Sequence, residues 1–167
     1  MAWELAIARR DQPSTLIFTR QNTAPQPRTA DAFADIRRGG YVLLDEQGTL
    51  DAVIIATGSE VEVAVAAAEQ LSAQGKGVRV VSMPSTDVFL AQDTDYRDRV
   101  LPPQVRARVA VDAAHPDYWY RFVGLDGAVV GIDRFGLSAP GGEAMAVLGI
   151  TADNVVATVE RVLDNAA

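Results

Sequence analysis

Hydrophobic residues along the chain fall into short runs that alternate with amphipathic stretches. Residues 52–56, AVIIA, contain no polar position, which is typical of a strand covered on both faces of a parallel sheet. Residues 57–59 contain the glycine of a tight turn, and residues 61–71 place apolar side chains at helical spacing. Residues 51–71 therefore predict a strand, turn and helix around which the other elements are organised.

The start of this predicted helix carries a second signal. Ser59 and Glu62 are three residues apart, the spacing of a capping box in which each side chain bonds the other residue's backbone N–H. Apolar positions account for one face of the helix, so Glu60, Glu62, Glu69 and Gln70 are expected on its remaining surface.

The same strand and helix patterns recur along the rest of the chain. Strands are predicted at 41–45, 78–83, 108–113 and 128–133, and helices at 30–36, 88–92, 93–100, 117–122, 143–148 and 152–163. Strands that alternate with helices imply an α/β fold: a three-layer α/β/α domain with a mostly parallel, mixed sheet of about five strands.

The N-terminal residues do not fit into that domain. Residues 1–10 predict the last turns of a helix, residues 14–19 a strand, and residues 20–27, with two prolines, a linker. A helix and a strand cannot form a domain, so we expect residues 1–38 to be the tail of a preceding domain and its linker. Residues 39–167 are then the complete α/β domain.

Composition narrows the function classes. Of 167 residues, 49% are hydrophobic and 22% charged, and no apolar run approaches the roughly 20 residues of a membrane span. A formal net charge of −7 disfavours nucleic acid as a partner. No signal peptide is evident, so a cytoplasmic location is expected. The chain has no cysteine and one histidine, and no acidic spacing resembles a calcium or magnesium loop.

The turn at 57–59 suggests phosphate binding, because a glycine turn before a helix presents free N–H groups and a positive dipole end. It has one glycine, lacks a P-loop lysine, and is followed by Glu60 and Glu62, whose charge would repel an anion. The pattern favours a structural turn over a ligand site.

Two further features are weighed in the same way. His115 is a candidate general base, but its sequence neighbours include no nucleophile, which favours a histidine at a loop end on the surface. The aromatic residues of DYWYRF, at 117–122, are candidates for stacking on a ligand, but their spacing favours packing in a core or an oligomer interface.

Arg20 is the best candidate for a ligand contact. It follows the predicted strand at 14–19 and precedes Gln21 and Asn22, where α/β sheets place ligand groups beyond the carboxyl ends of strands. A guanidinium at this position suits bidentate binding of a phosphate.

Several blocks closely resemble the C-terminal part of bacterial transketolases. They are LIFTRQN (16–22), RGGYVL (38–43), IATGSEVEVA (55–64), VRVVSMPSTDVF (78–89), YRDRVLP (96–102), DYWYRFVGLDGAVVGID (117–133) and FGLSAP (135–140). They occur in order across nearly the whole chain, and related thiamine enzymes of the same architecture are not expected to match all of them.

The resemblance implies an enzyme that transfers a two-carbon ketol unit between sugar phosphates of the pentose phosphate pathway. Such an enzyme is a homodimer that binds thiamine diphosphate with Mg²⁺ or Ca²⁺ between upstream domains. Residues 1–38 are then the end of the pyrimidine-binding domain and its linker, and Arg20 contacts the substrate phosphate. The family's catalytic, cofactor and metal residues have no counterpart in this chain, so the chain alone is expected to be inactive.

Two other interpretations remain open at this point. The chain can be a free-standing α/β module that binds a small molecule at the turn 57–59. It can also be an interaction or regulatory domain in which the DYWYRF segment and the buried strand and helix support oligomerisation.

Overall fold

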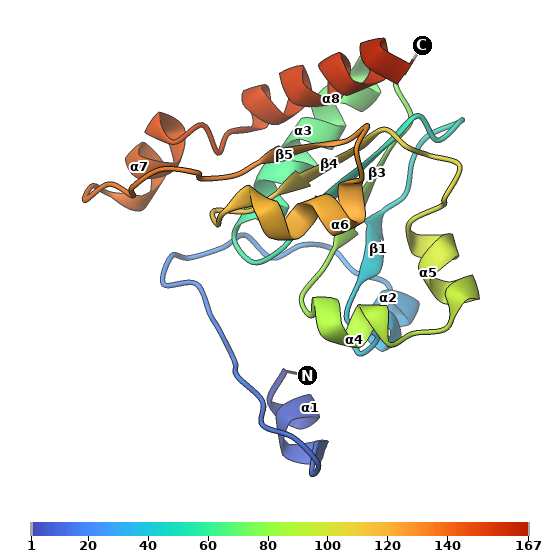
Figure 1. Cartoon of the computed structure of the whole chain (residues 1–167), viewed down its shortest axis with the longest axis vertical. Helices are drawn as coiled ribbons and strands as arrows, with labels where there is room; N and C mark the ends of the chain where they lie inside the picture. The colour runs from blue at the N-terminus through green and yellow to red at the C-terminus, as the bar shows by residue number, and fades with distance from the viewer. Residues whose placement is uncertain (1, 167) are drawn as a thin grey trace.

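A computed structural model describes residues 2–166, which form a five-stranded sheet with helices on both faces (Figure 1). The strands are β1 (Tyr41–Leu44), β2 (Ala52–Ala56), β3 (Val78–Ser82), β4 (Arg108–Val111) and β5 (Ala128–Val130). Their order in the sheet is β1-β3-β2-β4-β5. β1 runs antiparallel to β3, and all other neighbouring strands are parallel. The predicted three-layer α/β/α fold with a mostly parallel sheet is confirmed.

The helices connect these strands and cover both faces of the sheet. They are α1 (Ala2–Ala8), α2 (Ala30–Ile36), α3 (Glu60–Ala73), α4 (Thr86–Leu90), α5 (Thr94–Val100), the 3₁₀ helix η1 (Pro116–Trp119), α6 (Tyr120–Val123), α7 (Gly141–Val147) and α8 (Ala152–Ala166). Within residues 2–166 no helix is long and apolar enough to cross a membrane.

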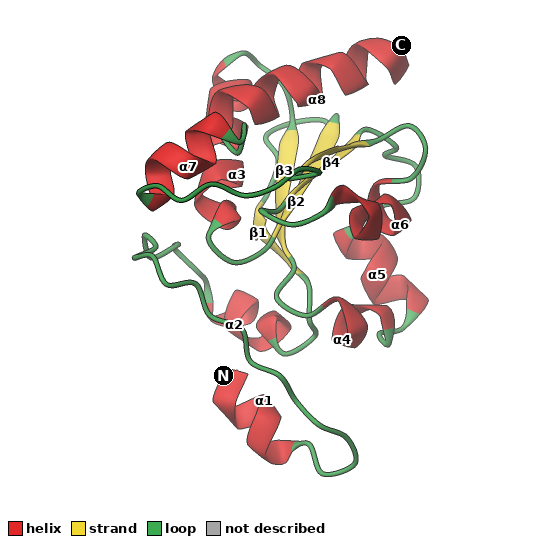
Figure 2. Ribbon diagram, turned by 60° about the vertical axis from the view of Figure 1, so that its left-hand side comes forward, coloured by secondary structure: helices red, strands yellow, loops and turns green. Residues whose placement is uncertain are grey.

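The central strand β2 contributes to the core on both sides. Ile54 packs with the apolar sides of α3 and α8 on one face. Val53 and Ile55 pack with residues of α4, α5 and α6 on the other face, as the two-sided arrangement of helices in Figure 2 shows. Every residue of β2 is at most 1% exposed. This two-sided burial explains the run of five apolar residues without a polar position.

The other predicted strands and helices are present, and all except the helix at 30–36 have altered ends. The strands predicted at 41–45, 78–83, 108–113 and 128–133 are β1, β3, β4 and β5, and each ends earlier than predicted. The helix predicted at 117–122 is the 3₁₀ helix η1 followed directly by α6, and Gly124, with a φ of 73°, follows its end. A positive φ of this kind favours glycine, and it turns the chain away from the helix.

The strand predicted at 14–19 is wrong. The segment forms no strand, and within it Ile17 is 90% and Phe18 64% exposed. Its β-branched and aromatic residues favour extended backbone, but a strand also needs a neighbour for its N–H and C=O groups. Among residues 2–166 no segment pairs with it.

Residues 2–28, which precede α2, form an arm on one side of the domain (Figure 1). The predicted helix at 1–10 is present as α1 within the described residues, while Met1 lies outside them, and α1 has no buried residue. Two ion pairs connect the arm to the rest of the chain, Arg37 to Glu4 at 2.7 Å and Arg9 to Asp87 at 3.7 Å. Surface pairs of this kind contribute little to stability.

Candidate functional site

Arg20 lies in the loop between α1 and α2, and its side chain is exposed. Its neighbours are locally ordered, because the backbone N–H of Gln21 donates to the Thr19 hydroxyl oxygen at 3.3 Å. Among residues 2–166 the Arg20 guanidinium makes no hydrogen bond or ion pair with another side chain or carbonyl. Its five N–H donors are therefore available to an anionic ligand such as a phosphate.

The loop that carries Arg20 passes the carboxyl edge of the sheet. The backbone N–H of Ala24 donates to Glu62 Oε2 at 3.1 Å, and Glu62 lies in the first turn of α3, directly after β2. Figure 2 shows this loop running below α7 and the lower end of α3. The strand expected before Arg20 is absent, but the loop still reaches the edge where parallel sheets bind ligands.

The capping box predicted at Ser59 and Glu62 is wrong. Ser59 has φ and ψ of −67° and −25° and makes no side-chain cap hydrogen bond. A capping side chain needs an extended backbone, whereas Ser59 is already helical. The preceding Gly58, with a φ of 57°, turns the chain one residue earlier, and the Glu60 N–H closes this turn on the Thr57 carbonyl at 3.2 Å.

The expectation that Glu60 lies on the helix surface is also wrong, although Glu62, Glu69 and Gln70 are exposed as predicted. Glu60 is only 4% exposed, and its Oε1 accepts a hydrogen bond from the Ser59 hydroxyl at 2.7 Å. Burial raises the pKa of Glu60. The Ser59 hydroxyl opposes this rise, and the nearby charge of Asp112 adds to it.

Asp112 forms a second acidic position at the same edge of the sheet. It follows β4 directly, as Glu60 follows β2 and its turn, and β2 and β4 are parallel neighbours. Burial raises the pKa of Asp112, and the hydrogen bond that Trp119 Nε1 donates to Asp112 Oδ2 at 2.8 Å opposes the rise. The sequence contained a signal for Glu60 and Asp112, because each follows a predicted buried strand and the carboxyl ends of parallel strands meet at one edge of the sheet.

The carboxyl groups of Glu60 and Asp112 argue against phosphate binding at the turn 57–59. The buried carboxyl group of Glu60 lies beside the turn, with Asp112 near it. Both groups place negative charge where a bound anion would need positive charge. The arrangement favours the structural interpretation of the turn.

His115 lies on the surface at the start of η1. Its side chain is 62% exposed, and its Nδ1 accepts a hydrogen bond from the backbone N–H of Asp117 at 3.4 Å. His115 is therefore the cap of a short helix, which agrees with the expected position at a loop end. Within residues 2–166 both polar contacts of the His115 ring are with Asp117, so the geometry supplies no catalytic role.

The aromatic cluster at 117–122 divides into two parts. Trp119 and Phe122 are 3% and 4% exposed and pack in the core, with ring centroids 5.6 Å apart. Tyr118 and Tyr120 are each 49% exposed. Packing in the core, as the helical spacing predicted, accounts for the first pair.

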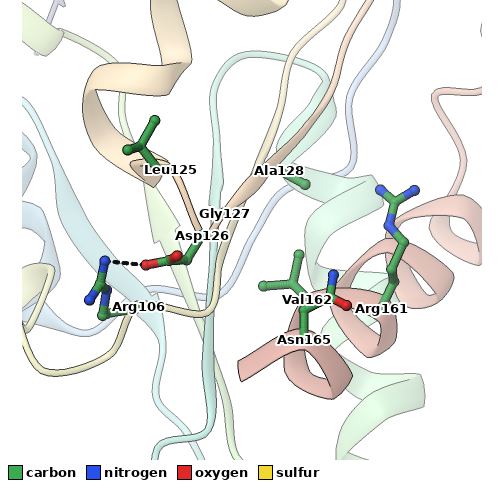
Figure 3. Close-up of a pocket in the computed structure, with 8 residues that line it drawn as sticks. All are labelled: Arg106, Leu125, Asp126, Gly127, Ala128, Arg161, Val162 and Asn165. Carbon is green, nitrogen blue, oxygen red and sulfur yellow. Dashed lines mark ion pairs between the residues drawn. The ribbon is translucent and has the colours of Figure 1, made fainter. Parts of the chain in front are cut away.

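Two cavities lie at opposite edges of the described part of the chain, and Arg20 lines neither of them. One, of about 580 Å³, opens at the amino edge of the sheet, between the ion pair of Arg106 and Asp126 and the end of α8 (Figure 3). The other, of about 630 Å³, lies between the N-terminal arm and α4. Residues 2–166 contain no group of three or more His, Cys, Asp or Glu side chains that could hold a metal ion.

Comparison with protein families supports the resemblance found in the sequence. Residues 39–151 match the family model described as the transketolase-like TK C-terminal domain. The chain is 55% identical to transketolase 2 of Vibrio parahaemolyticus and 52% identical to transketolase 1 of Aliivibrio fischeri, each over 163 residues and 98% of the chain. It spans about a quarter of the length of these relatives (25% and 24%).

Solved structures give the same result. The structure aligns with a transketolase from Leishmania mexicana with a TM-score of 0.90 and 39% identity, over 98% of this chain and 23% of that one. A transketolase from Pichia stipitis, described as a complex with xylulose 5-phosphate, aligns with a TM-score of 0.72 and 30% identity, over 79% of this chain and 19% of that one. The sequence, the fold and these matches show that the chain belongs to the transketolase family and contains that family's C-terminal domain.

Proposed function

We propose that this chain acts as the C-terminal quarter of a transketolase, which transfers a two-carbon ketol unit from a ketose phosphate to an aldose phosphate. The observation that carries the proposal is the 55% identity to a transketolase over 98% of the chain. We also propose that the complete enzyme is a cytoplasmic homodimer of the pentose phosphate pathway.

Within that enzyme, residues 1–38 form the end of the pyrimidine-binding domain and the linker, and residues 39–167 form the C-terminal domain. The exposed apolar side chains of the arm support this division. Trp3, Ile7, Ile17 and Phe18 are between 64% and 90% exposed. Apolar side chains gathered in this way are typical of a surface that another part of a protein covers.

Thiamine diphosphate and a divalent cation supply the ketol-transfer chemistry of the complete enzyme. The described residues include no group of three or more His, Cys, Asp or Glu side chains that could hold the cation. We assign cofactor binding and catalysis to the part of the enzyme outside this chain, and no catalytic residue within the chain.

Arg20 is the residue of this chain that we assign to substrate binding. Its exposed guanidinium has no partner among residues 2–166, and its loop lies at the carboxyl edge of the sheet. The Pichia stipitis transketolases described as complexes with xylulose 5-phosphate and sedoheptulose 7-phosphate support a phosphorylated substrate. In this role Arg20 binds the substrate phosphate, which is remote from the reacting carbonyl carbon.

The assignment as part of an enzyme is tested by domain replacement. A transketolase whose C-terminal quarter is replaced by this chain is expected to transfer ketol units from xylulose 5-phosphate to ribose 5-phosphate when cofactor and Mg²⁺ are present. The chain alone is expected to show no turnover under the same conditions. Turnover by the isolated chain would contradict the proposal.

The role of Arg20 is tested in the same enzyme by Arg20→Ala. Loss of a charged hydrogen bond to phosphate is expected to raise KM for ribose 5-phosphate about 10-fold or more, and to leave KM for unphosphorylated glycolaldehyde unchanged. Arg10→Ala, which removes an exposed arginine of the same arm, is the matched control. Equal effects of Arg20→Ala on both acceptors would contradict the phosphate role.

A further inference from the structure

Three contacts hold the segment after Arg20 against the C-terminal domain. The Gln21 side chain lies against Gly141 of α7, and the Ala24 backbone N–H donates to Glu62 of α3 at 3.1 Å. Further along, Arg28 Nε donates to the Tyr41 hydroxyl of β1 at 2.8 Å. The loop is therefore fixed at three points that belong to three separate elements of the domain.

The Glu62 side chain binds the backbone of this loop. Its carboxylate is exposed and accepts the backbone N–H of Ala24, 38 positions earlier in the chain. Ser59 does not form a reciprocal cap with Glu62, so the side chain is free to bind outside its own helix. A hydrogen bond from a backbone N–H to an ionised carboxylate is stronger than one between neutral groups, and it fixes the backbone four residues after Arg20.

The contact of Gly141 depends on its lack of a side chain. A Cβ atom at this position would lie 2.4 Å from Nε2 of Gln21 and 3.1 Å from its Cδ and Cγ. Gly141 does not have a positive φ, so its backbone does not require glycine. The adjacent Gly142 has no atom within 4 Å of an added Cβ. The space at Gly141 is therefore used by Gln21, the residue next to Arg20.

We propose that Glu62 and Gly141 are positioning residues. They hold the loop that carries Arg20, and so they place its guanidinium for binding the substrate phosphate. This inference rests on the proposed role of Arg20. It assigns the C-terminal domain a part in substrate binding although none of its own residues touches the substrate. A guanidinium binds phosphate with two parallel hydrogen bonds, so a small displacement of its loop weakens both.

The first test replaces Glu62 in a transketolase whose C-terminal quarter is this chain. Glu62→Ala is expected to raise KM for ribose 5-phosphate about 3- to 10-fold, the effect of one lost hydrogen bond, with kcat and KM for glycolaldehyde unchanged. Glu62→Gln retains an acceptor oxygen without the charge, so it is expected to raise this KM less than Glu62→Ala does. Glu69→Ala, on the exposed side of the same helix, is the control and is expected to change neither KM.

The second test uses the two adjacent glycines of α7. Gly141→Ala displaces Gln21 and is expected to raise KM for ribose 5-phosphate by a similar factor. Gly142→Ala makes the same chemical change one residue later, in open space, and is expected to have no effect on KM. Any gain in helix propensity from alanine is shared by both variants, so the comparison isolates the contact with Gln21.

The outcomes separate this inference from the proposed function. If Arg20→Ala acts on the phosphorylated acceptor alone while Glu62→Ala and Gly141→Ala match their controls, the positioning role is wrong and the phosphate role of Arg20 stands. If Arg20→Ala shows no preference for the phosphorylated acceptor, both are wrong. A rise of KM for both acceptors in Glu62→Ala would also overturn the positioning role.

Discussion

The guanidinium of Arg38 lies over the ring of Tyr96, with its Cζ atom 3.4 Å from the ring centroid. Arg99 approaches the same ring, with its Cζ 4.9 Å from the centroid, and the Tyr96 hydroxyl donates to the Gly40 carbonyl at 2.7 Å. Tyr96 is 1% exposed. The contacts of Tyr96 with Arg38 and Gly40 join the segment just before β1 to α5, and Gly40 and Tyr96 are 56 residues apart along the chain.

Tyr96→Phe is expected to destabilise the fold by about 1–2 kcal/mol, because it removes the hydroxyl and leaves the buried Gly40 carbonyl without its donor. Urea unfolding measures the change. Tyr120→Phe, which removes a hydroxyl from a ring that is 49% exposed, is the control and is expected to alter the stability little. A Tyr96 variant as stable as this control would show that the hydrogen bond contributes nothing net.

Tyr96 also makes the stability depend on alkaline pH. Burial, together with the charge of Asp35, raises the pKa of Tyr96 to about 12, from 10.0 for an ordinary tyrosine. The folded state therefore retains this proton more strongly than the unfolded state, so the free energy of unfolding falls as the pH rises from about 10 to 12. Tyr96→Phe is expected to lack this decrease. The measurement is urea unfolding at a series of pH values, and parallel curves for the two proteins would contradict the prediction.

The sequence predicted the domain well because its strands are buried on both faces. The run at β2 could be interpreted from the sequence because five apolar residues in a row, followed by a polar turn, are typical of a strand covered on both faces. The segment 14–19 has a similar composition but is no strand, because composition reports a preference for extended backbone and not the presence of a partner.

The site was less predictable because it depends on contacts between distant segments. The spacing of Ser59 and Glu62 fits a capping box, yet the positive φ of Gly58 moves the turn, and Glu62 binds Ala24 of the segment before α2. Helical periodicity likewise placed Glu60 on the surface, because a helical pattern does not show that Asp112 and its strand lie beside the first turn. Local spacing therefore identified these residues but not their partners.

Arg79 and Glu46 form an ion pair that is expected to contribute to stability. Arg79 Nε and Nη2 each donate to a different oxygen of Glu46 at 2.8 Å, and the two side chains are 12% and 18% exposed. Glu46→Gln leaves the Arg79 charge without its partner in a site largely shielded from water, so a loss of roughly 3 kcal/mol is expected. Glu69→Gln, at an exposed position, is the control.

The pH dependence of this effect has a defined sign. Burial alone raises the pKa of Glu46, but the hydrogen bonds and charge of Arg79 outweigh it, so the pKa lies below the ordinary value of 4.5. The stabilisation is present above that value and is lost as the pH falls through the pKa of the folded state. Melting temperatures of the original protein and Glu46→Gln should therefore differ at pH 7 and converge in acid. A constant difference at all pH values would contradict this explanation.

Arg108, at the start of β4, connects three loop and helix ends through backbone carbonyl groups. Its guanidinium donates to the carbonyl oxygens of Val105 at 2.9 Å, Phe122 at 3.0 Å, Leu101 at 3.2 Å and Pro102 at 2.8 Å. A lysine ammonium is a point charge that cannot reach all four, so even Arg108→Lys is expected to cost about 2–4 kcal/mol in urea unfolding. Arg106→Lys, at a side chain that is 72% exposed, is the control and should cost little. An equal loss of stability in both variants would show that the four hydrogen bonds of the Arg108 guanidinium are not what stabilises the fold.

Glu60→Gln is expected to stabilise the protein at neutral pH. Burial and the nearby Asp112 raise the pKa of Glu60, so its charged form is less favourable in the folded state than in the unfolded one. This group's contribution to stability is fully present below the ordinary pKa of 4.5 and is lost as the pH rises through the folded pKa. Glutamine has nearly the same shape, retains an oxygen for the Ser59 hydroxyl and carries no charge.

The expected gain of Glu60→Gln is on the order of 1 kcal/mol at pH 7.5, the scale of a removed desolvation cost, and it should vanish near pH 4, where Glu60 itself is protonated. Thermal unfolding of the two proteins at both pH values measures the difference, with Glu69→Gln as the exposed control. A lower melting temperature at pH 7.5 would mean that the ionised Glu60 has a stabilising partner. Such a partner would have to be a cation or an N–H donor beside the turn, and its presence would weaken the argument that acidic groups alone surround the turn 57–59.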